Sequence, residues 1–159
     1  MKIKQPTSNQ CFVCGRSNPY GLHLNFYNTG PGELTSYVNL PEHFQGYPGV
    51  VHGGIVAAIL DEATGRVFMQ GNKDRFMLTA KLDLRYRKPV PVGQDLVVKA
   101  RAIRDNGRVA QAAGEIQSME GETLAEAEAY YVNPPAGMIP DASPSDWGWR
   151  VIPDEEEAK

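Results

Sequence analysis

The 159-residue sequence lacks an apolar run long enough to cross a membrane, and it lacks an excess of basic residues. A transmembrane helix needs about 18 or more mostly apolar residues, which no segment supplies. The formal net charge of −3 argues against a nucleic-acid-binding module, which normally carries a basic surface. The first residues also lack the apolar segment of a secretion signal. We therefore expect a single-domain cytoplasmic protein with no nucleic-acid and no membrane partner.

Cysteine is scarce as well. The chain has two, Cys11 and Cys14, within Cys-x-x-Cys-Gly. A structural zinc site needs about four ligands, and these two with His23 supply at most three unless a second subunit contributes. A thioredoxin-type redox pair needs a following helix, whereas a turn follows here. Half a zinc site, a redox pair and a turn with two reduced thiols stay open. We favour the reduced turn and predict no metal.

Periodicity divides the chain into an arm (1–20), a folded domain (21–133) and a tail rich in proline and acidic residues (134–159). Alternation of apolar and polar residues predicts strands, and a helical period predicts one long helix that is buried nearly all round. We predict an α+β fold in which an antiparallel sheet of about six strands wraps around that helix. The expected strands are 22–27, 33–40, 79–88, 94–104, 108–119 and 123–132, and the expected helix is 53–69.

The tail contains Trp147, Trp149 and the acidic run Glu155–Glu157. Large aromatic side chains can pin an extended segment to the domain, and a polar segment with few apolar residues can equally stay disordered. Both readings of the tail remain open from the sequence.

The start of the predicted helix carries the strongest chemical signal. His52 is followed by Gly53 and Gly54, and adjacent glycines at a helix start leave backbone N–H groups free to hold a developing negative charge. Nine residues after His52 comes Asp61, a carboxylate on a mostly buried helix. Such a carboxylate costs free energy unless something pairs with it or uses it. The combination indicates an acyl-transfer site.

Gly53 and Asp61 are eight residues apart, which is about 12 Å on a helix that rises roughly 1.5 Å per residue. A base and an oxyanion donor that serve one carbonyl must both reach it within about 3 Å. Two antiparallel helices related by a two-fold axis satisfy this requirement. We therefore expect a homodimer with two composite sites.

The order of elements, with Gly49-x-x-His52-Gly53-Gly54 followed by Leu60-Asp61, resembles the hot-dog fold acyl-CoA thioesterases. It is most similar to the phenylacetate-pathway and human acyl-CoA thioesterase branch, over roughly residues 20–133. Thr79, ten residues before Pro89 at a Tyr-x-x-Pro strand end, strengthens the resemblance. It implies hydrolysis of an acyl-CoA thioester by a dimer or a dimer of dimers. Coenzyme A enters only as part of the substrate, and no cofactor is implied.

The resemblance also implies roles for individual residues. Asp61 would be the general base that activates water, or the nucleophile, and Glu62 beside it is a second candidate. The Gly53 N–H would polarise the thioester carbonyl and Thr79 would orient the water. His52 would shape the turn or contact the substrate near the carbonyl, and Gly54 would line the substrate site.

One departure from the family concerns the position six residues before His52. Relatives often place Asn or Gln there, whereas this chain has Gly46, so that Gln45 or His43 would have to replace the missing donor. One lost oxyanion donor costs about 10²–10³ in rate.

We also expect basic residues near the end of the strand that begins at Thr79 to bind coenzyme A phosphates, with an ordinary solvated strand face as the alternative. They are Arg85, Arg87 and Lys88.

Two other functions fit the same scaffold. A hot-dog hydratase or dehydratase is disfavoured because its catalytic His does not typically precede two glycines. A non-catalytic acyl-CoA binding or sensing protein is favoured by the absent donor at Gly46, and disfavoured by the presence of Asp61 and Thr79.

Overall fold

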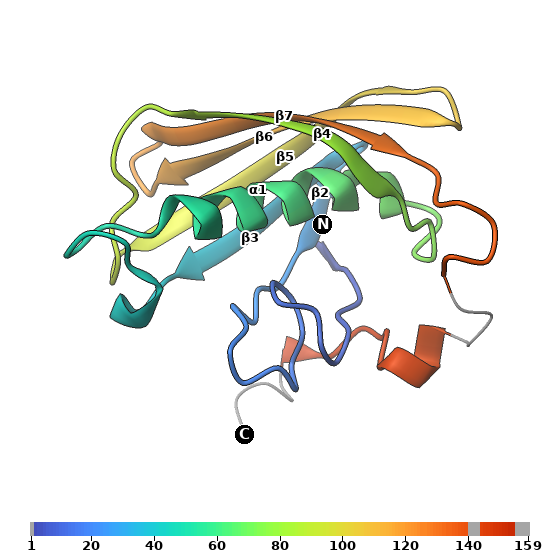
Figure 1. The fold of residues 1–159 in the computed structure, drawn as a ribbon, viewed down its shortest axis with the longest axis horizontal. Helices are drawn as coiled ribbons and strands as arrows, with labels where there is room; N and C mark the ends of the chain where they lie inside the picture. Colours follow the sequence, from blue (N-terminus) through green and yellow to red (C-terminus); the bar gives the residue numbers. More distant parts are fainter. Residues whose placement is uncertain (1, 140–143, 155–159) are drawn as a thin grey trace.

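The structure is a computed structural model that describes residues 2–139 and 144–154. One long helix lies along a curved antiparallel sheet, and the N-terminal arm and C-terminal segment lie on the far side of the helix (Figure 1). None of the described helices is both long and apolar enough to span a membrane. In chain order the elements are β1 (Ile3–Lys4), β2 (Tyr27–Gly30), β3 (Glu33–Asn39), η1 (Glu42–Phe44), α1 (Gly53–Arg66), η2 (Val67–Met69), β4 (Leu78–Tyr86), β5 (Asp95–Asp105), β6 (Val109–Ser118), β7 (Thr123–Val132) and η3 (Pro144–Trp147).

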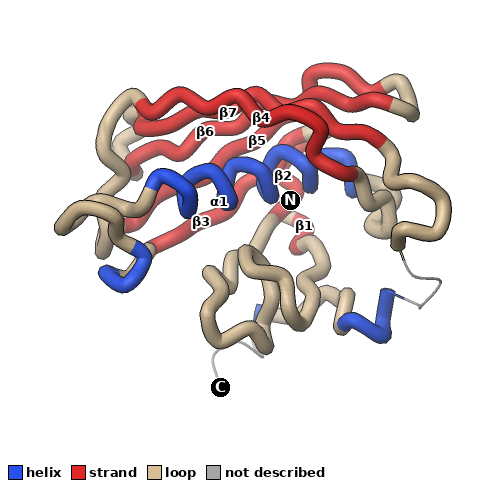
Figure 2. Tube along the Cα trace, viewed as in Figure 1, coloured by secondary structure: helices blue, strands red, loops and turns tan. Residues whose placement is uncertain are grey.

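The strands form one sheet in the order β1-β2-β3-β5-β6-β7-β4, with every neighbouring pair antiparallel (Figure 2). A tight turn joins β5 and β6: Gly107 has φ of 84°, and Asp105 Oδ1 accepts its N–H at 2.9 Å. The predicted architecture, an antiparallel sheet around one long helix, is confirmed. Among the described residues, the two-residue β1 raises the number of strands from about six to seven.

Helix α1 packs closely on the middle of the sheet. Its buried apolar side chains, Val56, Ile59, Leu60 and Ala63, form the core with the inward residues of β5, β6 and β7. Gly114 on β6 makes room for the helix, because a Cβ there would lie 2.8 Å from Thr64 Cγ2. The prediction that the helix is buried nearly all round is wrong for the single chain, since seven of the fourteen helical residues are only partly buried.

The predicted strand at 22–27 is wrong, because β2 begins only at Tyr27 and continues to Gly30. The alternation of apolar residues is real, since Leu22, Leu24 and Phe26 are all buried. Their backbone, however, bonds to the Cys-x-x-Cys loop: the Leu22 and Leu24 N–H groups donate to carbonyls of residues 12 and 13 at 2.8 Å. The alternation therefore indicates which side chains are buried. It does not indicate that the backbone hydrogen bonds go to a loop instead of a strand. The turn between β2 and β3 consists of residues 31 and 32.

The described part of the C-terminal segment packs on the domain. Trp149 is 6% exposed, donates from Nε1 to the Lys73 carbonyl at 3.1 Å and contacts the Phe76 ring edge-on. Thr7 and Arg150 exchange two backbone hydrogen bonds, which joins this segment to the N-terminal arm. Of the two readings of the tail, pinning by tryptophan describes residues 144–154. Glu155–Glu157 lie outside the described residues.

Substitution of Gly114 tests the close packing of α1 on the sheet. Gly114→Val places methyl groups where Thr64 already lies, so we expect a loss of about 1–3 kcal/mol in the free energy of unfolding by urea denaturation. Ala113→Val on the opposite face of β6 is the matched control and should change stability little. Equal losses in both variants would contradict the packing described for the helix.

Candidate active site

Asp61 lies in the second half of α1 and is half-buried. Its Oδ1 accepts a hydrogen bond from Thr79 Oγ1 at 2.7 Å. Thr79 is the second residue of β4, an edge strand, so its hydroxyl comes from a different element and is exposed to solvent. A carboxylate bonded to a hydroxyl beside solvent can hold and deprotonate a water molecule. The structure thus brings two of the predicted site residues together.

Tyr131 is a third member of this group, and sequence reasoning missed it. Its hydroxyl donates to the Asp61 carbonyl at 2.7 Å, lies 3.3 Å from Asp61 Oδ1 and 2.7 Å from Thr64 Oγ1. Burial raises the pKa of Tyr131 above its ordinary value, and the nearby carboxylate of Asp61 adds to the rise. Thr79 and Tyr131 are cross-strand partners on β4 and β7, so strand pairing was the signal that could have found it.

His52 caps the start of α1. Its Nδ1 accepts the Gly54 N–H at 2.9 Å, and its carbonyl accepts the N–H of Ile55 at 2.9 Å and of Val56 at 3.2 Å. Within the described residues the Gly53 N–H has no acceptor. Tyr86 OH donates to the Gly53 carbonyl at 2.7 Å and so ties the first residue of the helix to β4. One bare donor therefore remains at the helix start, where the helix dipole adds positive potential.

The loop before the helix carries the two side chains that could replace the missing donor. Gln45 Oε1 accepts the Gly49 N–H at 3.1 Å, and the His43 ring packs against Phe44 with centroids 4.3 Å apart. Gly46 backs onto His52, where an added Cβ would lie 3.3 Å from His52 Cα. The close contact between Gly46 and the capping residue His52 therefore leaves little room for a side chain at position 46.

Two expected parts of the site are not brought together in one chain. Gly53 and Asp61 are eight positions apart in α1, so their reacting groups are separated by about 12 Å along the helix axis. Glu62, the second candidate base, is directed to the N-terminal arm, and its Oε1 accepts a hydrogen bond from Arg66 Nε at 2.7 Å.

The three basic residues also lie apart from Asp61. Arg87 pairs with Glu126 at 2.7 Å, and Lys88 pairs with Glu122. Arg85 lines a groove of about 770 Å³ that also includes Lys99 and Arg101. Arg85 lies near the end of β4, and Arg87 and Lys88 follow that strand. Thr79 lies at the beginning of the same strand.

Comparison with known proteins identifies the family of this chain. The sequence model of the thioesterase superfamily matches residues 48–125, from the loop before His52 into β7. The chain belongs to the thioesterase superfamily. Acyl-coenzyme A thioesterase THEM4 of Mus musculus is 34% identical over 135 residues, 82% of this chain and 56% of that protein. The chain thus spans about half the length of the curated relatives it matches.

Solved structures confirm the hot-dog fold of this thioesterase superfamily member. A crystal structure of another thioesterase superfamily protein has a TM-score of 0.72 and 29% identity, covering 78% of this chain and 63% of its own. A phenylacetic acid degradation-related protein of Ralstonia eutropha has a TM-score of 0.62 and 27% identity, covering 70% of this chain and 85% of its own.

The buried hydroxyl of Tyr131 predicts a pH dependence of stability in this thioesterase superfamily member. Folding raises the pKa of Tyr131 and favours its neutral form, so the free energy of unfolding falls as the pH rises past the unfolded value of about 10. We expect urea denaturation between about pH 9 and 11 to show a steeper fall for the wild type than for Tyr131→Phe. Tyr20→Phe, at a residue 81% exposed, should behave as the wild type. Equal slopes in all three proteins would contradict this assignment.

Proposed function

We propose that the chain hydrolyses an acyl-CoA thioester to the free acid and coenzyme A. The hydrogen bond from Thr79 Oγ1 to Asp61 Oδ1 carries the proposal, because it orients a carboxylate for water next to solvent. Membership of the thioesterase superfamily and the mouse relative named an acyl-CoA thioesterase support the choice of substrate.

In the proposed reaction Asp61 takes a proton from a water molecule held with Thr79, and the water oxygen attacks the thioester carbonyl. The Gly53 N–H donates to the resulting oxyanion at the helix start, where the dipole adds to its effect. Collapse of the tetrahedral intermediate breaks the carbon–sulfur bond. Coenzyme A leaves with the proton and the acyl group leaves as the acid. A thioester is already activated, so these steps require no metal or cofactor. Direct nucleophilic attack by Asp61 uses the same groups.

The proposed site is composite. Gly53 of one protomer serves the carbonyl that Asp61 of its partner attacks through water, with the two α1 helices antiparallel across a two-fold axis. Two observations support a partner at this position. The β4 edge of the sheet is unpaired within the described residues, and its inward side chains Leu82 and Leu84 are only partly buried. We propose a homodimer as the working unit, which can pair further into a dimer of dimers.

Coenzyme A binding is assigned in this proposal to the three basic residues of β4 and its end. Arg87 and Lys88 form ion pairs whose members are between 37% and 56% exposed, and such exposed pairs contribute only about 0–1 kcal/mol. Phosphate groups can therefore displace Glu126 and Glu122 at little cost and gain charge-assisted hydrogen bonds. The cytoplasmic location stays a prediction.

A second candidate function is acyl-CoA binding without turnover. Gly46 favours this function, because glycine has no side chain to act as a second oxyanion donor, and the contact with His52 leaves little room for one. Both functions use the same site, and turnover distinguishes them.

Asp61→Asn tests the base. The amide cannot accept a proton from water, so we expect hydrolysis to fall about 10²–10⁴-fold while the fold is kept. The measurement is release of free coenzyme A from short, long and aromatic acyl-CoAs, quantified by chromatography. Asp83→Asn, an exposed carboxylate on the same strand as Thr79, is the matched control and should keep wild-type rates. A folded wild type that binds acyl-CoA without turnover would favour the sensing function.

Gly53→Pro tests the oxyanion donor. Proline is accepted at the first position of a helix, and His52 has φ of −58° and ψ of 135°, which suits a residue before proline. The variant loses the N–H and keeps the helix, so we expect a fall in turnover of about 10²–10³-fold. Gly53→Ala retains the N–H and has space beside Tyr86, where an added Cβ lies 3.5 Å from the hydroxyl, so it should stay active.

Mixing the two inactive variants tests the composite site. A dimer of one Gly53→Pro and one Asp61→Asn protomer has one intact site and one doubly altered site. Random co-assembly during co-expression should therefore restore about one quarter of the wild-type rate per protomer. No recovery in a co-purified mixed dimer would place both groups in a single protomer and overturn the shared site.

A further inference from the structure

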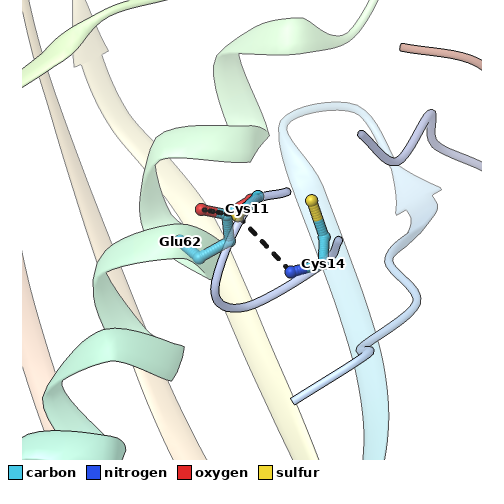
Figure 3. Close-up of side chains that lie close together, drawn as sticks. All are labelled: Cys11, Cys14 and Glu62. Carbon is cyan, nitrogen blue, oxygen red and sulfur yellow. Dashed lines mark hydrogen bonds between the residues drawn. The ribbon is translucent and has the colours of Figure 1, made fainter. Parts of the chain in front are cut away.

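The Cys-x-x-Cys loop packs against α1 on the side away from Thr79. Cys14 is 1% exposed, and Cys11 is half-buried beside Glu62 of the helix (Figure 3). Both cysteines are free thiols. No step of the proposed hydrolysis uses this group, although Glu62 is the neighbour of Asp61. The loop, the helix and a carboxylate thus meet at a place that the hydrolysis leaves unexplained.

The loop has the conformation of a metal-binding knuckle. Cys11 Sγ accepts the N–H groups of Val13 and Cys14, both at 3.4 Å. Gly15 follows Cys14 where no side chain fits, because a Cβ there would lie 2.4 Å from the Cys11 carbonyl oxygen. Both features fold the chain back so that the two sulfurs lie on the same side of the turn.

Three possible metal-ligating atoms lie close together. Cys11 Sγ, Cys14 Sγ and a Glu62 carboxylate oxygen all lie within 4.8 Å of one another, and Cys11 Sγ is 3.9 Å from Glu62 Oε2. With zinc–sulfur bonds of about 2.3 Å and zinc–oxygen bonds of about 2.1 Å, a tetrahedral site needs sulfur–oxygen separations of about 3.6 Å and sulfur–sulfur separations of about 3.8 Å. The observed sulfur–oxygen separation is therefore within a few tenths of an ångström of the required edge.

Arg66 prepares Glu62 for this role. Arg66 binds Glu62 through Oε1, which leaves Oε2 directed at Cys11 (Figure 3 shows Glu62 and both cysteines). The Arg66 side chain is 2% exposed and is held by the Pro6 carbonyl at 2.8 Å. Two thiolates, one carboxylate, one guanidinium and one divalent ion sum to zero charge, so a bound ion leaves no net charge beside the buried arginine.

We propose that Cys11, Cys14 and Glu62 bind a structural zinc ion, with a water molecule as the fourth ligand. Thiolate and carboxylate ligands in a tetrahedral set favour zinc among the common divalent ions. The ion fixes the N-terminal arm to α1 one residue from Asp61. Glu62 is the third ligand that the sequence did not reveal, whereas His23 lies outside the cluster and bonds to the Asn18 carbonyl instead. The prediction of no metal would then hold for the reaction alone.

The first test is the metal content of the full chain, purified under reducing conditions with any affinity tag removed. Inductively coupled plasma mass spectrometry should find about one zinc per chain. Chelation should lower Tm by about 10 °C or more, and one equivalent of zinc should restore it. Cobalt loaded into the wild type should give thiolate charge-transfer and tetrahedral ligand-field bands. These readouts require no catalytic turnover, so they stand apart from the proposed hydrolysis.

Variants assign the ligands. Cys11→Ser, Cys14→Ser and Glu62→Gln should each lose zinc at micromolar free metal, whereas Glu120→Gln, at an exposed carboxylate, should retain it. Loss of the cobalt thiolate band in a folded Cys11→Ser protein supports the assignment. Three results would overturn it: reduced wild type that takes up no zinc, zinc retained by both cysteine variants, or a zinc-free protein about 2 Da lighter than its reduced form, which would identify a disulfide pair.

Discussion

The close approach of α1 to the middle of the sheet determines where every candidate functional group lies. Gly114 admits the helix, and Thr64 fills the space that a side chain at Gly114 would take. At this depth the Asp61 carboxylate reaches the hydroxyl of Thr79 on the edge strand and the hydroxyl of Tyr131 beside it. A shallower helix would break the 2.7 Å hydrogen bond from Thr79 Oγ1, because O–H···O hydrogen bonds are about 2.5–3.0 Å long.

The same helix separates two adjacent carboxylates. Successive residues on an α-helix are about 100° apart, so Asp61 turns to β4 while Glu62 turns to the N-terminal arm. Asp61 meets hydroxyl groups and solvent. Glu62 meets the buried Arg66, and removal of one member of a buried ion pair costs about 3–5 kcal/mol. The carboxylate beside the proposed base is thereby committed to holding the structure together, which leaves one acid free for chemistry.

The elements that could be predicted are those whose period follows from burial on one face. The four strands β4 to β7 and the helix after His52 fall within two residues of their expected starts and within three of their expected ends. The segment at 22–27 shares the alternation, yet its backbone partners belong to a loop, and no local pattern reports which partner a buried strand finds. Thr79 could be named only because of a family resemblance, and the structure places its hydroxyl 2.7 Å from Asp61 Oδ1. Tyr131 depends on strand register, which composition does not encode.

The paired backbone bonds between Thr7 and Arg150 have a consequence for how the molecule opens. Each residue supplies both a donor and an acceptor, so neither strand-like segment can leave without breaking the bonds of the other. The N-terminal arm and the C-terminal segment therefore form one cooperative unit rather than two independently fraying ends. In a hydrogen-exchange experiment the two amide protons should lose protection together, at a rate set by a single opening event.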